Sequence, residues 1–91
     1  MLIIKFLDKE KYQWEKNKKS YNYLLYKAKV KLNKKNGEEV AFFIEGFLEK
    51  HDLDATQKNV SSIETSLHLS DVLYKNELIA VIENDFEFGV G

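Results

Sequence analysis

The chain has no cysteine, no proline and no arginine, and only four glycines among 91 residues. Without cysteine there is no disulfide framework, no thiolate nucleophile and no cysteine ligand for a metal. No glycine lies in a G-x-S-x-G or phosphate-loop pattern, so catalysis has no signature. We therefore expect a protein that is not an enzyme, carries no cofactor and works in the reducing cytoplasm.

Long apolar runs are also missing from the chain. The opening run, Leu2 to Leu7, contains Lys5 and is followed at once by charged residues, which makes it too short for a signal sequence or a membrane span. Hydrophobic residues at 44% suffice for a packed core, and the 32% of charged residues indicate a solvated surface. A chain of this length predicts a single domain over residues 1–91, with no membrane partner.

Charge is distributed unevenly along the sequence. Residues 1–36 carry eleven lysines against three acidic residues, a balance of +8, whereas residues 37–91 carry three lysines against twelve acidic residues, a balance of −9. All fourteen basic residues are lysine, and seven asparagines accompany them. This bias is typical of an AT-rich genome and points to a low-GC bacterium or its phage.

Apolar alternation predicts that the fold is α+β, an antiparallel sheet of four to five strands with one amphipathic helix packed on one face. The clearest strand begins at Asn22, where Leu24, Tyr26, Ala28, Val30 and Leu32 should be buried and Lys27, Lys29 and Lys31 exposed. Residues 8–20 could be helix, strand or loop, and so could residues 61–74. The other expected strands are Leu2–Leu7, Ile63–Leu69, Val72–Tyr74, Leu78–Ile82 and a C-terminal hairpin arm with Phe86, Phe88 and Val90.

One helix is expected over Glu38 to Lys50. Its large apolar residues recur with a helical period, and Phe43 and Phe47 should lie under the helix against the sheet. Asn36 followed by Glu39 resembles a capping box, although Asn36-Gly37 could instead form a hairpin turn. Gly46 weakens the helix and should permit close approach of the sheet or of a partner.

The outer face of this helix is the first candidate site. Phe42 lies opposite the apolar stripe, flanked by Glu38, Glu45 and Glu49, which is the form of a protein-docking anchor with a charged rim. The alternative is that Phe42 is covered within the chain by Tyr12 or Trp14. His51 and His68, the only histidines, have no metal-binding spacing, so no metal site is expected.

The second candidate site is the lysine-rich strand. Tyr21, Tyr23, Lys27, Lys29 and Lys31 would place aromatic rings and cations on one face, as single-stranded nucleic acids require. The plainer alternative is an edge strand protected by lysines or paired with acidic residues across the sheet. A lack of arginine weakens the nucleic-acid interpretation, because bidentate contacts to phosphate and guanine are missing.

Three functions follow as expectations. The first is a bacterial or phage inhibitor of the immunity or anti-defence type, which blocks a target protein with a basic surface. The second is a small nucleic-acid-binding module that uses the lysine and tyrosine face. The third is a structural subunit that forms a homo-oligomer through an open sheet edge.

Overall fold

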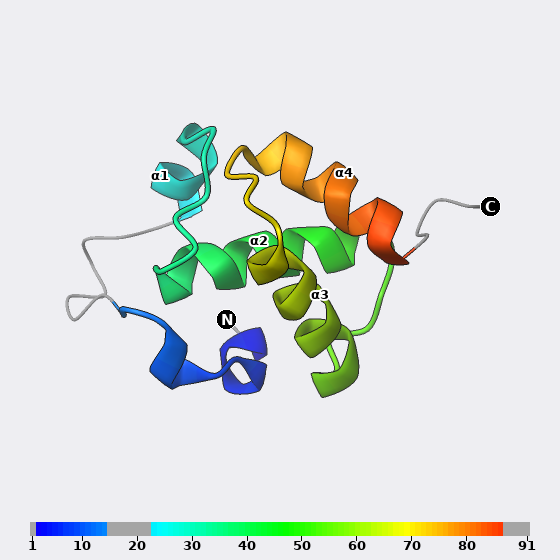
Figure 1. The fold of residues 1–91 in the computed structure, drawn as a ribbon. Helices are drawn as coiled ribbons and strands as arrows, with labels where there is room; N and C mark the ends of the chain where they lie inside the picture. The colour runs from blue at the N-terminus through cyan, green and yellow to red at the C-terminus, as the bar shows by residue number, and fades with distance from the viewer. Residues whose placement is uncertain (1, 15–22, 87–91) are drawn as a thin grey trace.

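Helices make up all the regular structure in the computed structural model, which describes residues 2–14 and 23–86 (Figure 1). Within these residues extended backbone pairs only at two isolated bridges, Gln13 with Asn36 and Lys31 with Tyr74. The expected α+β fold with its four to five strands is therefore wrong. The elements are the 3-10 helices η1 (Leu2–Phe6) and η2 (Lys9–Lys11) and the α-helices α1 (Tyr23–Ala28), α2 (Gly37–Lys50), α3 (Gln57–Leu69) and α4 (Lys75–Phe86).

Helix α2 confirms the one helix that the sequence predicts. The side chain of Asn36 caps it by accepting a hydrogen bond from the backbone N–H of Glu39 at 3.1 Å. Glu39 does not complete a capping box, because its carboxylate turns to Lys29 and to the backbone N–H of Asn33. Glu38 and Glu39 in the first turn and Lys50 in the last complement the helix dipole.

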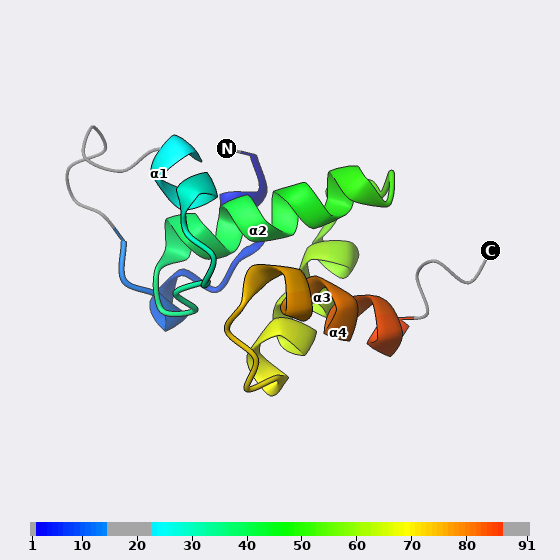
Figure 2. The ribbon, with the colours of Figure 1, turned by 90° about the horizontal axis from the view of Figure 1, so that it is seen from above.

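Helix α2 runs through the middle of the molecule (Figures 1 and 2). It packs against η1, against α1 near its N-terminal end and against α3, which also packs against α4. Phe43 and Phe47 are buried, as predicted, but they face other helices and not a sheet. The core that results consists of Ile3, Leu7, Tyr12, Tyr26, Leu32, Val40, Ala41, Phe43, Ile44, Phe47, Leu48, Val60, Ile63, Leu67, Leu78 and Ile82.

The two segments at the C-terminal side are helices where strands were expected. In α4, Leu78 and Ile82 are both 0% exposed while Ala80 is exposed, which is helical spacing and not the burial of a central strand. In α3, Val60, Ile63 and Leu67 share the buried face. The prediction failed because a short apolar run fits a buried strand and a buried helix equally well. Phe88 and Val90 of the expected hairpin lie outside the described residues.

The predicted strand from Asn22 to Leu32 is also wrong. Residues 23–28 form α1, and a loop with a bend at Val30 and a turn at Lys34 and Lys35 follows to the cap of α2. Tyr26 and Leu32 are buried as expected and the three lysines are exposed, but Ala28 is exposed and Val30 is 68% exposed. Helical turns place Tyr26 against α2, so the burial period of a strand does not continue through the segment.

The N-terminal segment replaces an expected strand and leads to the start of α2. Ile3 of its 3-10 helix η1 and Leu7, which directly follows that helix, are both buried. Beyond η2, the backbone N–H of Gln13 donates to Lys35 and its carbonyl accepts from Gly37 at 3.0 Å. Trp14 lies over Gly37 so closely that a Cβ there would come within 2.5 Å of the ring. Gly37 is therefore required by this contact.

Candidate functional site

An apolar groove with an acidic rim lies at the C-terminal end of α2. It encloses about 470 Å³, and its apolar lining comes from Ile3 of η1, Leu48 of α2 and Leu53 and Ala55 of the loop before α3. Glu45, Glu49 and Asp52 also line it. The N-terminal segment therefore meets the end of α2 and the loop that directly follows it in one groove.

The end of α2 shapes this groove through a Schellman motif. The backbone N–H of Leu53 donates to the carbonyl of Leu48 at 2.9 Å, and that of Asp52 donates to the carbonyl of Glu49 at 3.2 Å. The motif brings Leu53 and Leu48 together, as its usual hydrophobic contact requires. It also holds Asp52 in the left-handed region, at a φ of 53°, where glycine is the favoured residue.

The carboxylates of the rim have no paired cation in the part of the chain that the structure describes. None of Glu45, Glu49 and Asp52 forms an ion pair with any residue in the described ranges. The two residues between Glu49 and Asp52 turn toward α4, where Lys50 and His51 contact Glu83 at 2.9 and 2.8 Å. Hydrogen bonding by Lys50 lowers the pKa of Glu83. The groove thus keeps a local excess of negative charge.

The structure divides the predicted docking face in two. Glu45 and Glu49 reach the groove, whereas the half-buried ring of Phe42 lies 5.4 Å from the ring of Tyr26 and packs against the core. Intramolecular cover of Phe42 therefore includes Tyr26 of α1, a residue that the alternative did not name. Glu38, one turn before Phe42, is partly buried and does not line the groove.

Sequence reasoning missed the residues that complete the groove. Ile3 belongs to an expected strand, and neither candidate site from the sequence includes Asp52 or Leu53. Only the Asp52 position carried a local signal, since a helix end after Lys50 needs a left-handed residue to reverse the chain. The approach of η1 to the end of α2 is a long-range contact that no local pattern shows.

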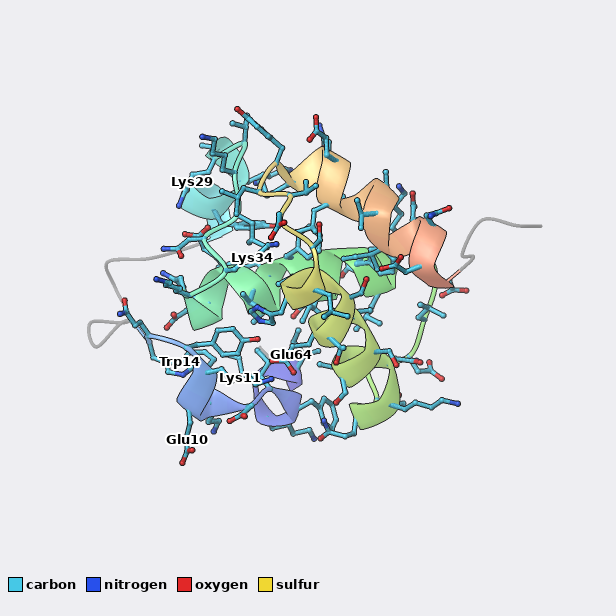
Figure 3. The ribbon with its side chains drawn as sticks, viewed as in Figure 1. Glu10, Lys11, Trp14, Lys29, Lys34 and Glu64 are labelled. Atoms are coloured by element: carbon cyan, nitrogen blue, oxygen red, sulfur yellow. The ribbon has the colours of Figure 1, made fainter. Side chains whose placement is uncertain are left out.

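A polar cluster joins the N-terminal segment to α3. The hydroxyl of Tyr12 donates to the carboxylate of Glu64, and Nε2 of His68 lies 2.8 Å from the same hydroxyl oxygen. Because the tyrosine proton is used on Glu64, His68 must donate through Nε2–H. Figure 3 shows Glu64 directed from α3 toward the segment that carries Lys11 and Trp14.

Chemically, this cluster favours a structural role. Burial raises the pKa of Tyr12, with the hydrogen bond and charge of Glu64 acting in the same direction. Burial lowers the pKa of His68, against the opposing charge of Glu64. A tyrosine held protonated is a poor base and a poor nucleophile, so the cluster anchors the N-terminal segment to α3.

The residues of the second candidate site lie at the other end of α2. Lys27 belongs to α1, and Lys29 and Lys31 follow it in the loop toward α2. Tyr21 and the side chain of Tyr23 lie outside the part that the structure describes. Glu49 and Gly37 are separated by twelve residues of α2, about 18 Å along the helix axis, so the acidic groove and these lysines occupy different surfaces.

In comparisons with protein-family models, with curated proteins and with solved structures, no match to the chain is found. Over the described residues, no helix has both the length and the apolar character that crossing a bilayer requires. In the same residues, no three side chains of the metal-binding types converge on one point. The chemistry of the groove is therefore what points to a function.

Proposed function

We propose that the protein is a non-enzymatic inhibitor that binds another protein through the acidic groove. The observation that carries this proposal is the combination of an apolar lining, from Ile3, Leu48 and Leu53, with carboxylates that have no ion-pair partner among the described residues. A basic segment of the target would place an apolar side chain in the groove and its lysines or arginines against the rim.

Charge complementarity explains how such binding would inhibit. A target that acts on nucleic acid presents a basic surface to its polyanionic substrate, and an acidic rim is attracted to that same surface. The rim charges would speed association, while burial of the apolar lining would supply most of the affinity. We propose a bacterial or phage setting and a cytoplasmic target, in line with the lysine and asparagine bias and the lack of cysteine.

Two residues at the groove support a binding role, because each lowers the stability of the fold. Asp52 occupies a left-handed position that glycine would fill with less strain. Gly46 is exposed between Glu45 and Glu49, and nothing lies within 4 Å of where its Cβ would be. Nothing in the described part of the chain packs against this glycine, and its open position supports the proposal that a partner approaches there.

The test compares two charge reversals of equal size. Glu45→Lys changes the groove, and Glu10→Lys changes an exposed residue of η2 outside its lining. Each variant and the wild type are used to capture proteins from a low-GC bacterial lysate, and each captured protein is purified for affinity measurement. We expect a protein with a basic surface whose affinity falls tenfold or more with Glu45→Lys and stays within about twofold with Glu10→Lys.

The proposal also predicts where the partner binds. Amide hydrogen exchange in the complex should slow at residues 45–55 and in η1, and not in the loop that carries Lys29 and Lys31. If both variants bind the captured protein equally, or if protection falls on the lysine loop, the groove is not the docking site.

The third expected function, a structural subunit that self-associates, has no structural basis in the described residues. It required an open sheet edge, and residues 2–14 and 23–86 contain no sheet. Homo-oligomerisation by that route is not proposed further.

A further inference from the structure

Two loops at the N-terminal end of α2 are paired and form one surface. The backbone N–H of Leu32 donates to Leu73 at 2.8 Å, and that of Lys75 donates to Val30 at 2.9 Å. These bonds hold the α1–α2 loop beside the α3–α4 loop, and both views show the two loops side by side (Figures 1 and 2). The surface is therefore held in place by backbone hydrogen bonds.

This surface, called the lysine face below, combines cations with exposed apolar groups. Val30 is 68% exposed, Tyr74 48% and Leu73 46%, which are large fractions for side chains of this size. Two hollows of about 460 and 450 Å³ lie along it, and both are lined by Lys29. The lysines of the face are Lys27, Lys29, Lys31, Lys34, Lys35 and Lys75.

Positive charge exceeds negative charge on the lysine face. Its acidic neighbours are Glu77, which lines one hollow, Asp71 beside Lys34, and Glu39, which is buried and already bonded to Lys29. Among the residues that the structure describes, six ammonium groups therefore lie on this face with three carboxylates. Figure 3 shows Lys29 on the α1–α2 loop, away from Glu64 and the N-terminal segment, and Lys34 between Lys29 and Glu64.

Several of these lysines are held by acceptors within the protein. Lys34 donates to the carbonyl of Ser70, and Lys75 donates to the carbonyl of Tyr26 at 2.8 Å while lying over the Tyr26 ring. Burial lowers the pKa of both amines. Because a fixed side chain loses less conformational entropy on binding, these cations are better prepared to meet an anion than freely moving lysines.

Tyr74 adds an exposed aromatic ring to the lysines of this face. Its half-exposed ring lies beside one hollow, with Nζ of Lys31 at 5.3 Å from the ring centroid. An exposed ring among lysines can stack an unpaired base while the lysines contact the phosphates on either side. Without arginine the face has no bidentate donor to read guanine, so recognition would tolerate many sequences.

We infer that the lysine face binds single-stranded nucleic acid, with Tyr74 stacking on a base and Lys31 and Lys35 contacting phosphates. An unpaired strand fits better than a duplex, because a duplex base has no free face for the Tyr74 ring. An anionic membrane fits less well, since the lysines line hollows along the face. This site is independent of the acidic groove, whose charge would repel a polyanion.

Fluorescence anisotropy with labelled fifteen-nucleotide oligo-dT, oligo-U and a fifteen-base-pair duplex tests the inference in the full chain. Wild-type protein should bind both single strands more tightly than the duplex at low salt. Lys31→Gln/Lys35→Gln should weaken this binding about tenfold and reduce the slope of log K against log salt by about 1.4, since each lysine that neutralises a phosphate contributes about 0.7. Lys9→Gln/Lys58→Gln, which removes two exposed lysines outside the face, should change affinity by less than about twofold.

Tyr74 variants separate stacking from charge. Tyr74→Ala should weaken binding about fivefold or more, and Tyr74→Phe should retain it, because only the ring is needed. Thermal melting shows whether a loss of oligonucleotide binding reflects unfolding of the variant. Tyr74→Phe is the control that keeps the aromatic ring. Binding to vesicles that contain anionic lipid is measured separately, because a membrane is the alternative anionic partner. The inference is overturned by binding to vesicles but not oligonucleotides, by equal losses of affinity in the two double-lysine variants, or by no oligonucleotide binding at low salt.

Discussion

Nζ of Lys29 donates a hydrogen bond to Oε2 of Glu39 at 2.7 Å, across ten residues of sequence. The other carboxylate oxygen of Glu39 accepts from the backbone N–H of Asn33 at 3.1 Å, and the side chain is almost fully buried. Glu39 also lies in the first turn of α2, at the positive end of the helix dipole. One buried carboxylate thus holds the loop after α1 against the start of α2.

Removing either partner of this pair should destabilise the fold unequally. Glu39→Ala leaves the Asn33 N–H and the Lys29 amine without their acceptor and should lower the free energy of unfolding by about 3 kcal/mol. Lys29→Ala should cost less, about 1 to 2 kcal/mol, because its amine is partly solvated and Glu39 keeps the Asn33 bond. Urea denaturation of both single variants and the double variant checks this. A coupling energy near zero would contradict the structural role of the pair.

The two glycines of α2 should respond in opposite ways to alanine. Gly46→Ala has open space and should stabilise the protein by about 0.5 to 1 kcal/mol, because alanine is the better helix former. Gly37→Ala would bring a Cβ within 2.5 Å of the Trp14 ring and should destabilise by about 1 to 3 kcal/mol. Thermal melts of the two variants provide matched controls for each other. Equal shifts in the same direction would be inconsistent with the packing of Trp14 on Gly37.

Replacement of Asp52 should separate stability from binding. Asp52→Gly relieves the left-handed strain and should raise the free energy of unfolding by about 0.5 to 1 kcal/mol. The same change removes a carboxylate of the groove, so affinity for a basic partner should fall. Asp52→Asn serves as the control, since it removes the charge and tolerates the left-handed backbone. A destabilised Asp52→Gly variant would show that the carboxylate itself supports the helix end.

Phe42 and Phe47 should differ in how much each contributes to the core. Phe47 is buried, and Phe47→Ala should cost about 3 to 5 kcal/mol. Phe42 is half-buried against Tyr26, so Phe42→Ala should cost about 2 kcal/mol, part of the full value for a packed aromatic. Chemical denaturation measures both. A cost near zero for Phe42→Ala, with partner affinity reduced, would restore Phe42 as a docking anchor.

The Tyr12 cluster predicts loss of stability at both ends of the pH range. Above pH 10 the unfolded chain ionises this tyrosine while the folded protein keeps its proton, so stability should fall by about 1.4 kcal/mol per pH unit. Below about pH 6.5 the unfolded chain protonates His68 more readily than the folded protein, so stability should fall again. Denaturation midpoints from pH 5 to 11 test this. Tyr12→Phe should remove the alkaline component, and an unchanged alkaline profile would show that Tyr12 is not the group responsible.

Local sequence predicted α2 because that segment is long enough to show its period. Its buried face recurs over four turns, and Asn36 provides an N-cap at its start. The burial of Phe43 and Phe47 followed from the same periodicity. The separation of positive and negative charge along the chain likewise became two surfaces near opposite ends of α2.

The secondary structure of the short segments was determined by the elements that they pack against. Leu78–Ile82 is a short, wholly apolar run that fits a buried strand and a buried helix equally well, and residues 22–32 alternate like a strand although residues 23–28 form a helix. Intrinsic preferences of their β-branched and aromatic residues differ by fractions of a kcal/mol, whereas burying one such side chain contributes about 1.5 to 3 kcal/mol. Contact with α3 therefore determined that α4 is helical, and contact with α2 determined that Tyr26 lies in a helix.

The two candidate sites also depend partly on local sequence and partly on tertiary structure. Sequence alone identified Glu45, Glu49, Lys29 and Lys31 as surface charges, because helical spacing and alternation place them away from apolar neighbours. Tertiary structure brought η1 to the end of α2 and paired the two loops of the lysine face, through contacts between residues that are distant in sequence. Such contacts depend on how all the helices share one core, so a local pattern determines which side chains are polar but not which of them meet.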